Sequence, residues 1–213
     1  MLSTPVVFVI DQDNALRSSL AALIRASGWR AETFASAREF LARPSAVVTS
    51  CLVLDVTLPD VNGLDLQKRI AVERPDLPVI FIAGSADVQT GVRAMKAGAF
   101  EFLVKPFDDA VLAGVIEAAL ERSRRTLEHQ SKLQSLRESY DSLTPREREV
   151  MVLVVSGLLN KQVGGELGIS EITVKAHRGQ VMRKMNAPSL PALVTMVARL
   201  GVPTPVTADL VWA

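Results

Sequence analysis

Cys51-Leu52-Val53-Leu54-Asp55 decides the fold, because four apolar residues that end in one carboxylate are typical of a buried strand. Two other stretches have the same form. Residues 6–10 are apolar and lead into Asp11, and residues 102–104 are apolar and lead into Lys105. In open α/β sheets, ligands bind at the carboxyl ends of the strands. We therefore expect two acids and one lysine to meet at one edge of a sheet.

Strand and helix patterns alternate through residue 120. Apolar stretches predict strands near 6–10, 31–34, 51–55, 79–83 and 100–104, and helical periodicity predicts helices near 14–26, 36–42, 63–73 and 87–97. This alternation predicts a five-stranded parallel sheet with helices on both faces, as one domain over residues 1–120.

A continuous helical pattern then runs from Asp108 to about Tyr140. An apolar face marks its first half, while its second half is mostly polar. A polar helix either bridges two domains through solvent or pairs with another chain. We interpret residues 121–140 as a linker helix.

A second, all-α domain is predicted over residues 141–201, followed by a tail over 202–213. Thr144-Pro145-Arg146-Glu147 is a helix start, with a capping box and proline at the first helical position. Four short helices are expected near 144–156, 161–167, 171–185 and 190–200. Gly168-Ile169-Ser170 would join the second and third of them at the spacing of a helix-turn-helix.

Composition and charge limit the partners of the protein and its location in the cell. The 213 residues carry a net charge of +1, with −3 over residues 1–120 and +4 over the rest, which weakly indicates a basic partner surface in the C-terminal half. We expect no signal peptide, because Thr4 and Pro5 lead into a strand without a basic segment. No apolar stretch approaches the ~20 residues of a membrane span. With Cys51 as the single, strand-buried cysteine, the expected location is cytoplasmic.

The expected sheet edge suits phosphoryl chemistry. An aspartate can attack a phosphoryl group and form an acyl phosphate. Mg²⁺ prefers carboxylate oxygens, and Asp11 and Asp55 can supply them. Lys105 can pair with a phosphoryl oxygen. We therefore predict a phosphoryl site with Mg²⁺ as its cofactor.

Residues 5–120 resemble a response-regulator receiver domain, a flavodoxin-like module. The resemblance implies Asp55 as the phosphoacceptor, Lys105 at the phosphoryl site, Phe102 as an aromatic switch and a sensor histidine kinase as the partner. Two positions depart from the family pattern. Gln12 stands where the family has a second acid, which weakens metal binding, and Asp13 is expected to cap the next helix instead.

The second departure lies at the end of the fourth strand. Ala83 occupies the phosphoryl-site position where the family has Thr or Ser, so a hydroxyl that contacts the phosphoryl group is missing. Ser85 lies two residues too far along to replace it. One absent hydrogen bond to a charged group is worth roughly 1.5–3 kcal/mol.

Residues 143–200 resemble the LuxR-type helix-turn-helix domain, with Asn160-Lys161-Gln162-Val163, Thr173-Val174-Lys175 and His177 among the matching residues. The order of a receiver, a long linker helix and a LuxR-type domain resembles the NarL/FixJ family of response regulators. The resemblance implies double-stranded DNA as a partner and a homodimer when active. On the last helix, Leu193, Val194 and Val197 are the expected contact stripe, although some of them must also close the small core.

Helical periodicity sorts the recognition helix into two faces. Val174, Val181 and Met185 form the expected core face, with His177 on the same side. Ile172, Lys175, Ala176, Gly179 and Arg183 lie towards the other face, which is expected to look at DNA. With Lys161 of the preceding helix, the expected DNA-binding residues are Lys161, Thr173, Lys175, Ala176, Arg178, Gly179, Arg183 and Lys184. Lys175 is the expected base reader. Arg178 can reach a base or a phosphate. Phosphate contacts are expected from Lys161, Thr173, Arg183 and Lys184.

Three functions remain open at this point. The first is a transcription regulator controlled by phosphorylation of Asp55. The second is a phosphorylation-independent regulator whose degenerate receiver, marked by Gln12 and Ala83, serves as a dimerisation or ligand-binding module. The third is an aspartyl phosphotransferase enzyme, but such sites need a second aspartate two residues after the nucleophile, where this chain has Thr57. We therefore predict a regulator and not an enzyme.

Overall fold

The computed structural model describes residues 4–44, 47–84 and 88–203. The chain divides into two compact units, with the boundary between His129 and Gln130. The boundary falls within the long helix α5 (Asp109–Asp141), so this helix contributes to both units. Each unit has a hydrophobic core of its own.

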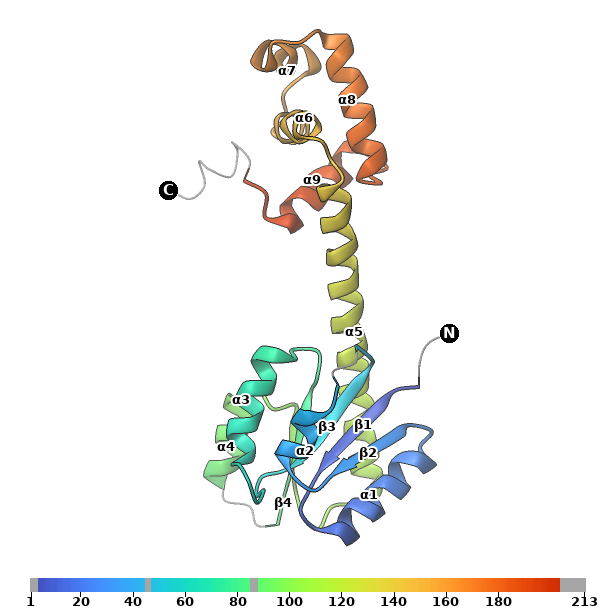
Figure 1. The fold of residues 1–213 in the computed structure, drawn as a ribbon, viewed down its shortest axis with the longest axis vertical. Helices are drawn as coiled ribbons and strands as arrows, with labels where there is room; N and C mark the ends of the chain where they lie inside the picture. The colour runs from blue at the N-terminus through green and yellow to red at the C-terminus, as the bar shows by residue number, and fades with distance from the viewer. Residues whose placement is uncertain (1–3, 45–46, 85–87, 204–213) are drawn as a thin grey trace. The chain divides into compact units, whose positions relative to one another are not determined.

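The N-terminal unit alternates strands and helices. Before α5 the order is β1 (Val6–Ile10), α1 (Asn14–Ala26), β2 (Arg30–Phe34), α2 (Ala37–Ala42), β3 (Ser50–Asp55), α3 (Gly63–Glu73), β4 (Val79–Ala83), α4 (Val88–Lys96) and β5 (Glu101–Val104). The strands pair in parallel in the order β2-β1-β3-β4-β5 (Figure 1). The five predicted strands and the parallel sheet are confirmed.

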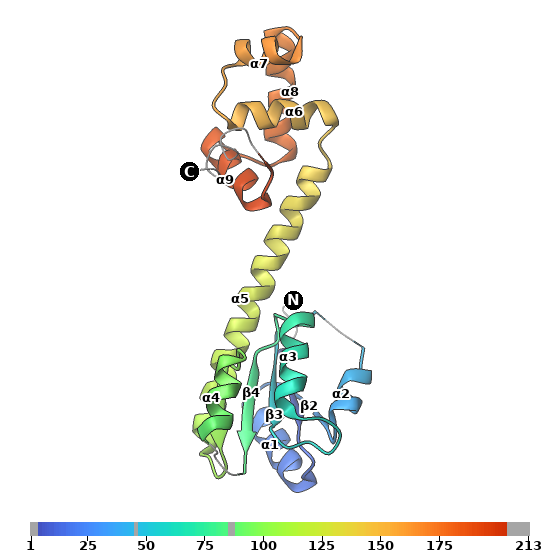
Figure 2. The same cartoon turned by 90° about the vertical axis from the view of Figure 1, so that its left-hand side faces the viewer.

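Alternation along the central strands separates two cores. Helices α2, α3 and α4 cover one face of the sheet, and α1 and α5 cover the other (Figures 1 and 2). In β1, Phe8 packs in the core on the first face, and its neighbours Val7 and Val9 pack in the core on the second. All three side chains are buried, as expected for a parallel strand that is covered on both sides. Cys51 lies within the second core, and burial raises the pKa of its thiol, so this cysteine is an inert apolar residue.

The C-terminal unit is all helical. It contains α6 (Pro145–Val155), α7 (Asn160–Leu167), α8 (Glu171–Lys184) and α9 (Leu190–Leu200). The predicted capping box is present, with Thr144 and Glu147 bonded to each other's backbone amides. Val174, Val181 and Met185 are buried, which confirms the expected core face of α8.

The last turns of α5 pack against the C-terminal core. Leu136 and Tyr140 contact a cluster that includes Leu143, Met151 and Val181. The Arg148 guanidinium lies 4.8 Å from the centre of the Tyr140 ring. The second half of this helix is therefore only partly polar, and its end is built into the C-terminal unit.

No helix in the described part of the chain is long and apolar enough to cross a membrane.

Candidate functional site

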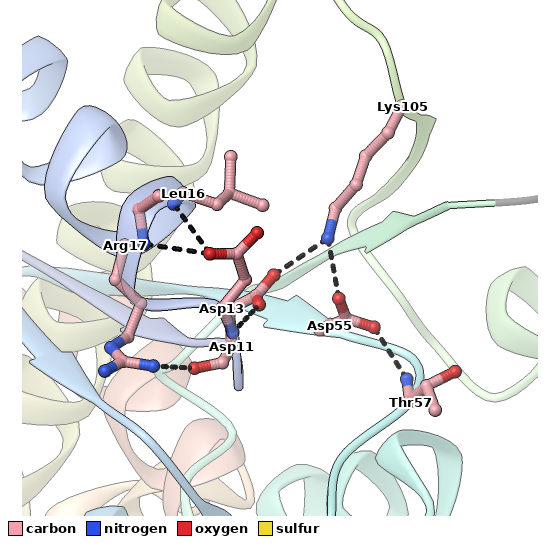
Figure 3. Close-up of polar contacts among 8 residues, drawn as sticks. Asp11, Asp13, Leu16, Arg17, Asp55, Thr57 and Lys105 are labelled. Carbon is pink, nitrogen blue, oxygen red and sulfur yellow. Dashed lines mark hydrogen bonds and ion pairs between the residues drawn. The ribbon is translucent and has the colours of Figure 1, made fainter.

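Asp11, Asp55 and Lys105 meet at the carboxyl edge of the sheet, although they are separated by up to 94 residues in the chain. Lys105 follows β5, and its Nζ donates hydrogen bonds to Asp11 Oδ2 at 2.8 Å and to Asp55 Oδ2 at 2.6 Å (Figure 3). The Lys105 amide also donates to the carbonyl of Ala83, at the end of β4. The three predicted residues thus form one cluster.

Backbone amides orient both carboxylates. Asp11 Oδ1 accepts the amide of Asp13, and Asp55 Oδ1 accepts the amide of Thr57, both at 2.7 Å (Figure 3). Each carboxylate therefore has one oxygen held by the backbone and a second oxygen directed at the shared ammonium. Asp11 is 1% exposed and Asp55 is 8% exposed, so both carboxylates are largely shielded from water.

Burial and the hydrogen bonds of the Lys105 ammonium shift the pKa values of Asp55 and Lys105. Burial raises the pKa of Asp55 above its ordinary value of 3.8, and hydrogen bonds from Lys105 and Thr57 oppose only part of that rise. Burial also acts to lower the pKa of Lys105, but its hydrogen bonds to Asp11 and Asp55 outweigh this effect, so the pKa lies above 10.5. The lysine therefore stays cationic and can balance a phosphoryl oxygen.

The donor set at this edge fits Mg²⁺. One or two carboxylates are what Mg²⁺ usually takes from a protein, with waters and phosphate oxygens completing its shell. Asp11 and Asp55 direct one oxygen each to a common point, which the Lys105 ammonium occupies. Gln12 is exposed beside Asp11 and adds no carboxylate. Within the described residues, no three acidic, histidine or cysteine side chains gather as a metal site.

The two departures from the receiver pattern follow different strands, Gln12 after β1 and Ala83 at the end of β4. Ala83 is buried at the end of β4 and offers only a methyl group. Ser85 lies outside the described residues. Phe102 is half-buried in β5, with its ring 6.3 Å from the Phe81 ring, and it faces Gly91 of α4. The aromatic ring therefore lies between the sheet and α4.

The helix-turn-helix is formed by α7 and α8. Gly168 ends α7 in the left-handed conformation, and the Ser170 side chain caps α8 by accepting the Thr173 amide. A Cβ added at Gly164 would lie 2.7 Å from the Ile169 carbonyl, so α7 and the turn approach too closely for any side chain there. The predicted turn is confirmed.

The outward face of α8 has the expected residues. Ile172 is 80% exposed, and Lys175, Ala176, Gly179 and Arg183 are also exposed. Lys175 pairs with Glu171 one turn earlier, a surface pair whose strength is small. Arg183 contacts Gln180. Lys161 and the half-buried Thr173 lie near the starts of α7 and α8.

Arg178 has a partner that periodicity did not indicate. Its guanidinium donates to Asn160 Oδ1 at 3.1 Å, which links the middle of α8 to the start of α7. The His177 side chain beside it is half-buried. In the sequence, Asn160 is part of the helix-turn-helix motif Asn160-Lys161-Gln162-Val163. No local pattern predicts its bond to Arg178, which lies 18 positions away.

Lys184 is engaged within the domain, which the sequence did not indicate. Its Nζ donates to Glu147 Oε2 at 2.7 Å and to the Ser142 carbonyl at 3.1 Å. The hydrogen bond from Lys184 lowers the pKa of Glu147 below 4.5, against the opposing effect of burial. Stability from the ionised carboxylate is therefore present above that value and is lost as the pH falls through the lowered pKa. The expected phosphate contact by Lys184 stays a prediction.

Arg17 is a further residue that the sequence analysis missed. From the first turn of α1, its guanidinium donates to the Asp11 carbonyl at 2.6 Å (Figure 3). It also donates to Asn14 Oδ1 at 3.0 Å. The expected cap of the same helix is confirmed, because Asp13 accepts the amides of Ala15 and Leu16. The sequence signal for this contact is an arginine placed one helical turn after the Asp13 cap.

The expected contact stripe on α9 is divided. Leu193 and Val197 are buried in the domain core, whereas Val194 is exposed. Two of the three residues therefore close the core, as a helix of a small domain must.

Two family models match the chain. Residues 7–117 match the response regulator receiver domain, and residues 141–197 match the luxR family of bacterial regulatory proteins. The chain is 48% identical over 197 residues to nodulation protein W of Bradyrhizobium diazoefficiens, covering 92% of this chain and 87% of that protein. It is 41% identical over 195 residues to response regulator protein TmoT of Ectopseudomonas mendocina, covering 92% and 89%.

Solved structures agree with the sequence matches. Response regulator StyR matches with a TM-score of 0.84 and 41% identity, covering 92% of this chain and 100% of that one. Full-length FixJ from B. japonicum matches with a TM-score of 0.55 and 36% identity, covering 94% and 98%. Both matched families are those of regulators rather than enzymes. The chain therefore belongs to the NarL/FixJ family of two-component response regulators, which regulate transcription through a receiver domain and a LuxR-type DNA-binding domain.

Proposed function

We propose that Asp55 is the phosphoacceptor, and that its phosphorylation controls dimerisation and DNA binding. The observation that carries this proposal is Lys105 bridging Asp11 and Asp55 at the carboxyl edge of the sheet. The donor is the phosphohistidine of a sensor histidine kinase. An Asp55 oxygen forms the new P–O bond as the P–N bond breaks, and the leaving imidazole takes up a proton.

The residues of the cluster have separate tasks. The Thr57 amide holds one Asp55 oxygen and so directs the other outward for attack. Lys105 balances a phosphoryl oxygen after it exchanges its present partners. Asp11 and Asp55 would hold Mg²⁺, which neutralises charge that develops on the transferring group. The protein acts in the cytoplasm, where kinase and DNA are both accessible.

On the DNA-binding unit, we propose that α8 enters the major groove of double-stranded DNA. Lys175 reads a base edge, and Arg178 reaches a base or a phosphate. Ala176 and Gly179 are small and let the helix approach the bases closely. Lys161, Thr173 and Arg183 contact phosphates. The active protein is a homodimer on two half-sites, with the exposed Val194 at the contact.

Changing Gln12 to Asp is expected to tighten Mg²⁺ binding by roughly tenfold, because it adds a hard oxygen ligand beside Asp11. Calorimetric titration of the full chain with MgCl₂ measures the effect. Gln12→Asn is the matched control, since it has the shape of the aspartate variant without its charge. Equal affinities in the Asp and Asn variants would contradict the placement of the metal.

Changing Lys175 to Ala is expected to cost about 1–3 kcal/mol on a duplex selected from a random pool and to relax specificity at one base pair. Lys161→Ala should instead weaken all duplexes alike and flatten the salt dependence by about one unit of slope. Fluorescence anisotropy with selected and random duplexes at several salt concentrations separates the two roles. If Lys175→Ala lost affinity equally on both duplexes, that lysine would be a phosphate contact.

A further inference from the structure

One buried carboxylate joins three segments of the DNA-binding unit. The Glu147 side chain is 7% exposed, and its Oε2 accepts both the Thr144 amide at 2.8 Å and the Lys184 ammonium at 2.7 Å. Lys184 Nζ also donates to the Ser142 carbonyl at 3.1 Å. The carboxylate therefore does more than cap α6, which is the role that its capping-box position indicates.

The three segments belong to different elements of the fold. Ser142 directly follows the last residue of α5, Glu147 lies in the first turn of α6, and Lys184 is the last residue of the recognition helix. The contacts from Lys184 span 37 and 42 residues of the chain. The end of α8 is thus attached to the point where α5 enters the domain.

Packing and polar contacts together hold this end of α8, because Val181, Met185 and Ala187 are buried in the C-terminal core beside it. The middle of α8 is held by the buried Val174 and by the bond from Arg178 to Asn160. Beyond Met185 the chain turns at once, with Asn186 in the left-handed region. A cation at a helix C-terminus also interacts favourably with the helix dipole. The Lys184 contacts are therefore well placed to set the tilt of the helix.

We propose that Glu147 and Lys184 are positioning residues that fix the orientation of the recognition helix for specific DNA binding, and that Lys184 is not a phosphate contact. This inference rests on the DNA-binding function of the C-terminal unit. The two roles of Lys184 predict opposite results when Glu147 is neutralised. A positioning pair loses its attachment, whereas a phosphate-binding lysine is released from a competing carboxylate and binds DNA more tightly.

The test uses the full chain with Glu147→Gln, Lys184→Met and the double substitution. The probes are one duplex selected from a random pool by the wild-type protein and one random-sequence duplex. Both single variants are expected to bind the selected duplex at least about fivefold more weakly, the equivalent of one lost base contact. Binding to the random duplex and the salt slope should stay as in the wild type. The double variant should be no weaker than either single variant, because the pair acts as a unit.

Lys161→Met is the matched control, because Lys161 is an exposed lysine at the start of α7. It should flatten the slope of log K against log salt by about 0.9, as expected for one phosphate contact. The same flattening in Lys184→Met, or tighter binding by Glu147→Gln, would overturn the proposal. So would wild-type affinity for the selected duplex in both single variants.

Folding is checked by circular dichroism at the assay temperature. Glu147→Gln keeps an oxygen that can accept the Thr144 amide, so the cap of α6 is retained. If that variant is nevertheless unfolded, Lys184→Met decides the question, because it leaves the capping box untouched. Failure of the wild-type protein to select any duplex would instead contradict the DNA-binding function itself.

Discussion

Replacing Asp55 with asparagine is expected to abolish phosphoryl labelling and, with it, any increase in dimerisation and DNA affinity that labelling causes. The amide lacks the nucleophilic carboxylate, although its oxygen can still accept the Thr57 amide and so preserve the loop. The measurement is intact mass after incubation of the full chain with acetyl phosphate and Mg²⁺. Oligomeric state and DNA affinity are then compared for the labelled and unlabelled proteins.

Asp13→Asn is the matched control for this experiment. Asp13 is an exposed carboxylate near the cluster that caps α1, and asparagine is an equally good capping residue. This variant should be labelled like the wild type. Label that persists in Asp55→Asn would show another acceptor. A wild-type protein that takes no label, yet binds DNA, would instead favour the phosphorylation-independent regulator suggested by Gln12 and Ala83.

Changing Gly164 to Ala is expected to destabilise the DNA-binding unit by about 1–3 kcal/mol, because the new methyl group has no room. Its Cβ would lie 2.7 Å from the Ile169 carbonyl, which is backbone and belongs to the turn of the helix-turn-helix. Relief of this overlap must move α7 away from the turn. Specific DNA binding should therefore fall together with stability.

Gly165 supplies the control, because it is the next residue of the same helix and a Cβ there meets nothing within 4 Å. Gly165→Ala should stabilise the unit by roughly 0.5–1 kcal/mol, since alanine loses less backbone entropy in a helix. Hydrogen exchange of residues 145–200 in the full chain reports both effects. If the two variants changed the stability of the unit by the same amount and in the same direction, the close approach of Gly164 to the Ile169 carbonyl would be contradicted.

Much of this fold follows from local patterns. The strand that ends at Asp55, the Asp13 cap and the Thr144 capping box were all predicted from residues that lie close together in the sequence. Such features depend on interactions between residues a few positions apart, so the local sequence determines them. The carboxyl-edge cluster was predictable for a related reason, because parallel strands bring their ends to one edge.

The partners of the charged side chains were decided only by the tertiary structure. Lys184 has the same chemistry as Lys161, and the sequence predicts a phosphate contact for both, yet the Lys184 ammonium is bound to Glu147. Likewise, the sequence did not indicate which of the three apolar residues on α9 close the core, and the structure buries Leu193 and Val197 while Val194 is exposed.

Periodicity states which face of a helix is apolar, but not how the helices cross or which distant side chain is within reach. The sequence by itself therefore determined the elements, the turn and the residues that meet at the sheet edge. Which lysines are free to bind a ligand depended on the packing of α6 against α8, because an ion pair between residues 37 positions apart exists only after that packing has formed.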